Sequence, residues 1–187
     1  MIKNTLLVVG LIVFLGCKST KTELPEIGTD VGDLAPELSY PNPNDSIISL
    51  SSYQGEIVLI DFWASWCGPC RYENRNLIRT VERFEETEFP GEKGFFKQKT
   101  TQGFRVFNVS LDQNKDAWIR AIKQDQLNWE SHVSDLGGWR SEGAAKYGVR
   151  SIPSNYLIDA KGVIIGKNLR GKALDDFLEA YKLPEQN

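Results

Sequence analysis

The sequence is poor in residues that hold metal ions. Its 187 residues include three cysteines, one methionine, which is Met1, and one histidine, His132. A structural zinc site usually needs four ligands, and copper(I) favours sites rich in cysteine and methionine sulfur. We therefore expect no metal centre. A non-enzymatic protein that binds copper(I) through a cysteine pair is kept as an alternative.

The chain also lacks a strong charge of either sign. Its formal net charge is -3, and no basic stripe with interleaved aromatic residues is present. Such a stripe is the footprint of nucleic-acid binding, so we expect no nucleic-acid partner. We find no glycine-rich phosphate loop and no internal repeat, and we expect no cofactor. Hydrophobic residues make up 41% of the chain, which is enough for one globular domain.

No apolar run is long enough to cross a bilayer, which takes about 20 residues. The run 5–15 follows Lys3 and leads into Gly16-Cys17. A positive residue followed by a short apolar run is typical of a signal peptide. The segment Phe14-Leu15-Gly16-Cys17 resembles a bacterial lipoprotein signal, in which the cysteine becomes the lipidated first residue. An ordinary secretory signal that leaves Cys17 as a free thiol is the alternative.

Three segments are predicted from this N-terminus. Residues 1–16 form the signal peptide, 17–30 form a polar, lipid-anchored flexible tether, and 31–187 form the domain. The predicted location is extracytoplasmic, on a bacterial membrane and facing the periplasm. Lys18 after the lipidation site, in place of aspartate, resembles outer-membrane sorting.

A cysteine pair is the most informative motif of the chain. Residues 66–70 read Trp-Cys-Gly-Pro-Cys and follow an apolar run that ends at Asp61. Gly68 and Pro69 suit a turn into a helix, whose N-terminus would stabilise a thiolate at Cys67. A thiolate is the nucleophile of disulfide exchange. An inert structural disulfide is the alternative, although so small a ring removes little chain entropy.

Hydrophobic periodicity predicts an alternating order of strands and helices. Residues 70, 73, 77, 81 and 84 share one helical face, so Glu73 is expected on the core side with Cys70. The polar segment 85–103 is predicted as an inserted loop with a short helical turn. This order implies an α/β fold with a mixed sheet. The predicted strands are 36–40, 46–50, 56–63, 104–109, 155–158 and 163–167, and the helices after the first are 116–127, 143–147 and 174–181.

Residues 61–70, Asp-Phe-Trp-Ala-Ser-Trp-Cys-Gly-Pro-Cys, resemble the active-site segment of the thioredoxin superfamily. Ser151-Ile152-Pro153-Ser154 resembles its cis-proline loop. The N-terminal hairpin and the central insertion are similar to the exported, membrane-tethered TlpA/ResA-like thiol–disulfide oxidoreductases. The resemblance covers about residues 31–183. It implies a thioredoxin-like fold, with a central mixed β-sheet flanked by helices, an extra N-terminal β-hairpin and a central insertion.

The resemblance also implies roles for individual residues. Cys67 would be the exposed attacking thiolate, Cys70 the buried resolving thiol, and the two would form the redox disulfide. Pro153 would be cis beside them, and backbone near Ile152 would hold a substrate strand. The residues expected to bind substrate are Trp66, Gly68, Pro69, Ile152 and Pro153.

Two acids are candidates for proton transfer to and from Cys70. Asp61 matches the buried acid of thioredoxin, and Glu73 matches that of the exported branch. Burial should raise a carboxyl pKa toward neutrality, where it can accept a thiol proton. A strand-end acid that reaches solvent is the alternative for Asp61, and a first-turn helix acid is the alternative for Glu73. Which acid dominates stays open at this point.

The expected activity is reduction of extracytoplasmic protein disulfides, of the cytochrome c maturation or periplasmic repair kind. The implied partners are disulfide-containing proteins, a membrane thiol electron donor of the DsbD or CcdA type, and the membrane that holds the lipid anchor. A monomer is expected. A peroxiredoxin-like thiol peroxidase is an alternative, but residues 64–67 read Ala-Ser-Trp-Cys instead of Thr-x-x-Cys. A copper(I)-binding lipoprotein is the other alternative.

Overall fold

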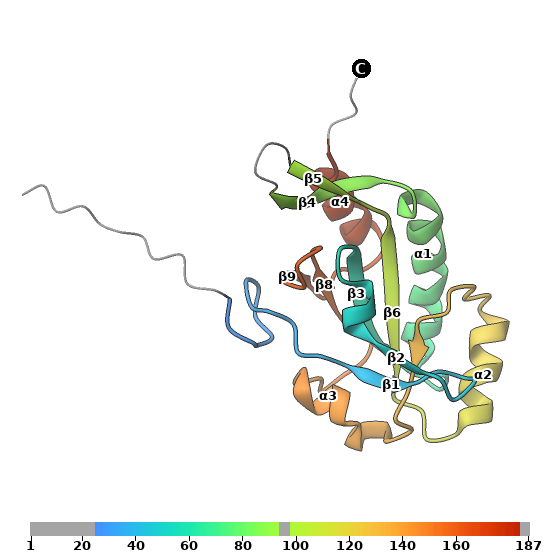
Figure 1. Ribbon diagram of the computed structural model, residues 1–187. Coiled ribbons are helices and arrows are strands. Elements are labelled where there is room, and N and C mark those ends of the chain that lie inside the picture. Colours follow the sequence, from blue (N-terminus) through green and yellow to red (C-terminus); the bar gives the residue numbers. More distant parts are fainter. Residues whose placement is uncertain (1–24, 94–97, 184–187) are drawn as a thin grey trace, which may run out of the picture.

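The computed structural model describes residues 25–93 and 98–183 and is built around a mixed sheet (Figure 1). The strand order is β7-β6-β3-β8-β9. Strands β3, β6 and β7 are parallel, whereas β8 and β9 run antiparallel to their neighbours. The strands are β3 (Ile57–Trp63), β6 (Phe104–Ser110), β7 (His132–Val133), β8 (Ser154–Ile158) and β9 (Ile164–Lys167). The predicted mixed sheet is confirmed; β7, at two residues, is too short to produce a sequence pattern.

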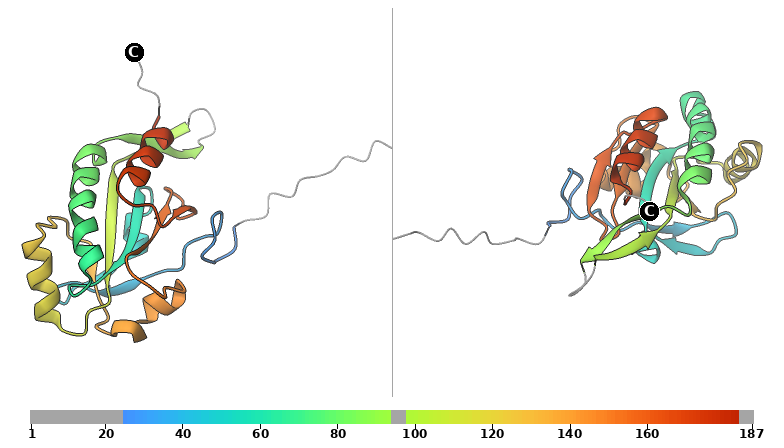
Figure 2. Two further views of the ribbon diagram at one scale, coloured as in Figure 1. Left: turned by 180° about the vertical axis from the view of Figure 1, so that it is seen from behind. Right: turned by 90° about the horizontal axis from the view of Figure 1, so that it is seen from above.

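Helices flank this sheet on both faces. α1 and α4 lie side by side on one face (Figure 2), where Thr80 donates a hydrogen bond to Asp175 at 2.6 Å. α2 lies beside the cysteine end of α1, and α3 lies on the other face with the N-terminal hairpin. The helices are α1 (Gly68–Phe84), α2 (Lys115–Gln124), α3 (Glu142–Lys146) and α4 (Lys172–Tyr181), with short 3-10 turns η1 (Leu50–Tyr53) and η2 (Gly138–Arg140).

Strand β3 is buried along its whole length, as its continuous apolar run predicts. Ile57 and Leu59 pack in the cluster under α1 and α4, and Val58 and Ile60 pack in the opposite cluster. Successive side chains of a strand point to opposite faces. The alternation therefore places Asp61 on the α1 face.

The N-terminal hairpin is confirmed. Strand β1 (Ser39–Pro41) pairs antiparallel with β2 (Ile47–Ser49). Oδ1 of Asn42 accepts hydrogen bonds from the backbone N–H groups of Asn44 at 2.9 Å and Ser46 at 3.0 Å. This side chain closes the turn, as asparagine commonly does.

The central insertion differs from the prediction. In place of a loop with a helical turn, residues 85–103 contain the antiparallel strands β4 (Glu88–Lys93) and β5 (Gln98–Gln102). Phe89 is fully buried, and its ring centroid lies 6.4 Å from those of both Phe84 and Tyr181. Among the side chains that the structure describes in this hairpin, Phe89 is the buried one, and backbone pairing joins the two strands. The polar sequence of the segment gives no strand pattern from which this pairing could have been predicted.

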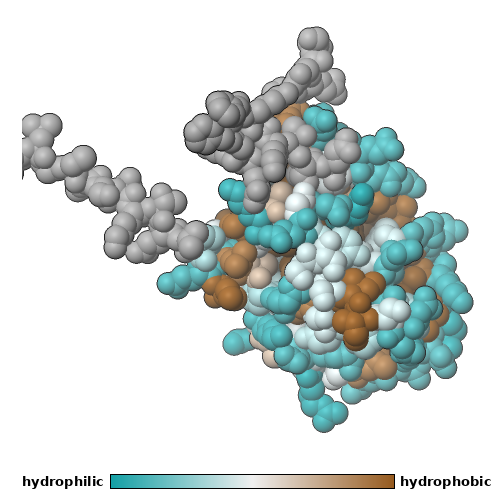
Figure 3. All heavy atoms as spheres, viewed as in Figure 1, coloured by the Kyte–Doolittle hydropathy of each residue, from teal (hydrophilic) through white to brown (hydrophobic). Residues whose placement is uncertain are grey.

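Residues just before position 31 contact the domain. The Leu34 N–H donates to the Glu26 carbonyl at 2.8 Å, and Lys167 pairs with Asp30 at 3.1 Å. Residues 26–30, predicted as tether, therefore contact the domain. Cys17 and the predicted signal peptide lie outside the described residues. In the part of the chain that the structure describes, no helix has the length and apolar character to cross a membrane. The face seen in Figure 3 is largely hydrophilic, with separate apolar patches.

Candidate active site

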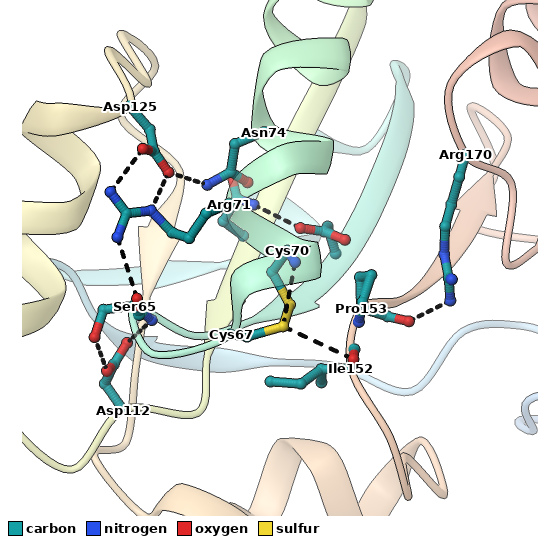
Figure 4. Close-up of a disulfide and its surroundings, with 12 residues drawn as sticks. Ser65, Cys67, Cys70, Arg71, Asn74, Asp112, Asp125, Ile152, Pro153 and Arg170 are labelled. Atoms are coloured by element: carbon teal, nitrogen blue, oxygen red, sulfur yellow. Dashed lines mark hydrogen bonds and ion pairs between the residues drawn. A yellow bond between two sulfur atoms is a disulfide. The ribbon is translucent and has the colours of Figure 1, made fainter.

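Cys67 and Cys70 are joined by a disulfide at the N-terminus of α1 (Figure 4). Cys67 is the residue that caps the helix: its Sγ accepts a hydrogen bond from the Cys70 N–H at 3.2 Å. Pro69 occupies the first turn, where a missing N–H costs nothing. The free N–H groups and the positive end of the helix dipole therefore face the Cys67 sulfur, an arrangement that stabilises a thiolate there.

The two sulfurs differ less in accessibility than expected. Cys67 is 5% exposed and Cys70 is 1% exposed, so Cys67 is not the openly exposed residue that the resemblance implied. Sγ of Cys67 lies 3.8 Å from the carbonyl oxygen of Ile152. The Ile152–Pro153 bond is cis, as the resemblance implied. The cis-proline loop covers Cys67 from the side opposite the helix, which explains its low exposure (Figure 4).

The loop before the cysteines is anchored by Asp112, which is 1% exposed. Its carboxylate accepts hydrogen bonds from the Ser65 N–H at 2.9 Å and the Ser65 hydroxyl at 2.5 Å. Arg71 donates to the Ser65 carbonyl at 3.1 Å and also pairs with Asp125 of the α2 C-terminal turn. These bonds hold the approach to Cys67 in one conformation (Figure 4).

Asp61 is buried, at 2% exposure, and does not reach solvent as its alternative interpretation required. Asn108, its register partner on β6, donates its amide to Oδ2 of Asp61 at 3.0 Å, whereas Oδ1 has no partner among the described residues. Burial, followed by the charge of Glu73, raises the pKa of Asp61 to about 7. The Asn108 hydrogen bond and the charge of Arg170 act in the opposite direction.

Glu73 lies in the second turn of α1, not the first, and is 7% exposed. Both of its carboxylate oxygens accept hydrogen bonds. Oε1 accepts from the backbone N–H of Gly171 at 2.7 Å, and Oε2 accepts from the side-chain amide of Asn76 at 2.7 Å. Gly171 caps the N-terminus of α4, so Glu73 ties α1 to the positive end of that helix.

A further buried chain of polar contacts continues behind Asp61. The Trp129 indole N–H donates to Oδ1 of Asn108 at 2.6 Å and so orients the amide toward Asp61. The His132 ring stacks on Trp129 with a centroid separation of 5.5 Å. Burial lowers the pKa of His132 to about 4, so this histidine is a neutral packing residue at pH 7.

The comparisons with known proteins agree with this geometry. A family model described as the AhpC/TSA family matches residues 31–167. The chain belongs to the AhpC/TSA family. A thiol-disulfide oxidoreductase of known structure from Bacteroides fragilis is 31% identical, with a TM-score of 0.65, and the match covers 79% of this chain and 98% of that one.

Two further similar proteins are named as enzymes of thiol–disulfide exchange. The thiol-disulfide oxidoreductase ResA of Bacillus thuringiensis is 27% identical over 162 residues, which cover 87% of this chain and 80% of that protein. The thiol:disulfide interchange protein DsbE of Pseudomonas aeruginosa is 24% identical over 160 residues, which cover 84% and 76%. This AhpC/TSA family member is thus a ResA-like thiol-disulfide oxidoreductase. The predicted exchange through Cys67 and Cys70 is confirmed, and neither the peroxidase nor the copper alternative is favoured.

Several site residues of this family member were not predicted from its sequence. Asn108, Asp112 and Asp125 lie 38 or more residues after Cys70 and reach the site only through strand pairing and helix packing. Arg170 donates to the carbonyl oxygen of Pro153 from the loop before α4. Of these residues, Asp112 could have been noticed in the sequence, because it comes just after the carboxyl end of the predicted buried strand 104–109, where site residues often lie.

Proposed function

We propose that this protein reduces disulfide bonds of proteins outside the cytoplasm. The Cys67 thiolate attacks one sulfur of a substrate disulfide, forms a mixed disulfide and releases the other substrate sulfur as a thiolate. The Cys70 thiolate then attacks Sγ of Cys67, closes the Cys67–Cys70 disulfide and releases the second substrate sulfur. The substrate gains two electrons and two protons. A thiol donor must then reduce the protein again.

The different surroundings of the two sulfurs support this sequence of steps. Cys67 accepts the Cys70 N–H at the helix N-terminus, which favours its thiolate and makes it the attacking group. Cys70 is almost fully buried, and burial disfavours a thiolate. Cys70 therefore needs a nearby proton acceptor when its turn to attack arrives.

We assign this proton transfer to Asp61 and a positioning role to Glu73. Asp61 has one carboxylate oxygen without a partner among the described residues, and its pKa of about 7 allows it to take up and release a proton near neutral pH. Glu73 accepts one hydrogen bond on each carboxylate oxygen, from the Asn76 amide and the Gly171 N–H, and these bonds fix its position between α1 and α4. The charge of Glu73 contributes by raising the pKa of Asp61.

The substrate strand is proposed to pass beside the cis-proline loop. Backbone near Ile152 lies next to the Cys67 sulfur, where it can pair with an extended substrate segment. Gly68 adds no side chain above the disulfide: a Cβ built there meets no atom within 4 Å among the described residues. Pro69 and Pro153 complete the substrate-binding surface together with Trp66.

We also propose a membrane location and an electron donor for this protein. The segment that ends at Cys17 supports lipid anchoring, and Lys18 supports the outer membrane. The electron donor is proposed to be a membrane thiol protein of the DsbD or CcdA type, and the working form is a monomer. Mass spectrometry of the mature protein tests the anchor: a lipid-modified N-terminal Cys17 supports it, and an unmodified Cys17 contradicts it.

The reduction potential of the Cys67–Cys70 pair tests the proposed direction. It is measured by equilibrating the protein in dithiothreitol or glutathione buffers. A potential of about −270 mV or lower, as in thioredoxin, is expected for a reductant. A potential near about −120 mV would reverse the proposed direction, since it marks a strong oxidant.

A further inference from the structure

Two exposed indole rings lie in contact beside the cysteines. Trp66 is 55% exposed and Trp139 is 54% exposed, and their ring centroids are 6.2 Å apart with the planes inclined at 53°. In contrast, Trp63 and Trp118 are at most 1% exposed. Single exposed apolar residues are normal, but large apolar side chains that adjoin one another on a surface mark a place where a partner binds.

The turn that presents Trp139 is held by its own hydrogen bonds. The Asp135 carboxylate accepts from the N–H groups of Gly137 and Glu142, each at 2.9 Å. Gly138 has a φ of 59°, which favours glycine, and a Cβ on Gly137 would lie 2.9 Å from the Ser141 backbone. The turn is therefore preorganised, so binding there loses little conformational entropy.

The position of the pair limits what can bind to it. Trp66 is the sequence neighbour of Cys67, and Cys67 is only 5% exposed, so a substrate sulfur must approach closely to react. An extended chain advances about 3.3 Å per residue. The residues on either side of a substrate cysteine therefore come within reach of the Trp66 ring and of the Trp139 ring packed on it.

We infer that Trp66 and Trp139 form an aromatic binding surface for a large apolar side chain next to the substrate cysteine, and that Trp139 determines this preference. The inference rests on the proposed function. The occupant is an extended polypeptide segment with a residue such as phenylalanine beside its cysteine. Tryptophan suits this role because its ring buries a large area at low entropic cost and often dominates binding energy.

The test compares two short peptides as disulfide-linked homodimers, one with phenylalanine and one with serine on both sides of its single cysteine. The reduced protein reacts with each, and the second-order rate constants are measured by acid quench and mass spectrometry. The ratio of the two constants is the readout, because a change in the reactivity of Cys67 itself cancels from it. The variants are Trp139→Ala, the conservative Trp139→Phe, and Val31→Ala, which shortens another exposed apolar residue beside β9.

The natural protein is expected to prefer the phenylalanine peptide by about tenfold, the effect of one good aromatic contact. Trp139→Ala should bring the ratio of the two rate constants close to one. Trp139→Phe should retain part of the preference for the phenylalanine peptide, and Val31→Ala should retain all of it. Equal rates in the natural protein, or a preference that survives Trp139→Ala, would overturn the inference while leaving the exchange function intact. If neither peptide reacted, the result would overturn the inference and the proposed disulfide reduction together.

Discussion

Replacing Asp61 by asparagine should make the protein more stable at alkaline pH and less active. The folded structure raises the pKa of Asp61 from its ordinary value of 3.8 to about 7, chiefly by burial. Between pH 3.8 and about pH 7, Asp61 is protonated to a greater extent in the folded protein than in the unfolded chain. The free energy of unfolding of the natural protein therefore falls as pH rises through this window and levels off above it.

The size of this effect follows from the two pKa values. One pH unit of differential proton binding is worth about 1.4 kcal/mol, so the cost of ionising Asp61 grows by about 2–3 kcal/mol between pH 5 and pH 8. Asparagine does not ionise and avoids this cost. Its amide must still be accommodated where Oδ1 of Asp61 has no partner among the described residues, but that cost is the same at both pH values.

Urea unfolding of the oxidised protein at pH 5 and pH 8 measures the difference. The stability gained by Asp61→Asn should be about 2–3 kcal/mol larger at pH 8 than at pH 5, and other titrating groups cancel in the comparison. Asp176→Asn, on the exposed side of α4, is the matched control and should show no such change. The rate of protein disulfide reduction at pH 7 should fall by about tenfold to a hundredfold in Asp61→Asn.

An equal gain at both pH values would refute the reasoning, because it would mean that Asp61 is ionised throughout this range. A full rate of reduction in Asp61→Asn, together with the expected change in stability, would instead keep the raised pKa and remove Asp61 as the proton acceptor for Cys70.

Three further outcomes are expected. Cys70→Ser should accumulate a mixed disulfide with a protein substrate on non-reducing gels and Cys67→Ser should not, so trapping by Cys67→Ser would reverse the assigned roles. Asn108→Ala removes an amide whose hydrogen bond lowers the pKa of Asp61, so the midpoint of the pH–rate profile should move to higher pH, and an unchanged midpoint would contradict this. Phe89→Ala should lower the free energy of unfolding, measured in urea, by about 3–5 kcal/mol, and the reduction potential should stay unchanged. A decrease in the free energy of unfolding of less than about 1 kcal/mol would show that the β4–β5 hairpin does not depend on this ring.

The sequence predicted the parts of the structure that depend on local patterns. The apolar run of β3, the helical face that carries Cys70 and Glu73, and the hairpin around Asn42 were recognisable because strand and helix periodicities and turn residues act over a few positions. The β4–β5 hairpin was missed for the same reason. Its strands carry few apolar residues, and Phe89 is the main anchor within the described residues.

By itself, the sequence determined the chemistry of this protein: a cysteine pair at a helix N-terminus, with Glu73 on the core side of that helix and Asp61 at the end of the preceding apolar run. It could not decide between the two acids, because both look alike as residues. The tertiary structure gives the two acids different surroundings, and our proposal of Asp61 rests on that difference. Gly171, distant in sequence, donates a hydrogen bond to Glu73, whereas Asn108 binds one oxygen of Asp61 and the other oxygen has no partner among the described residues. Burial and hydrogen-bond partners set a carboxyl pKa, and both are properties of packing between distant segments.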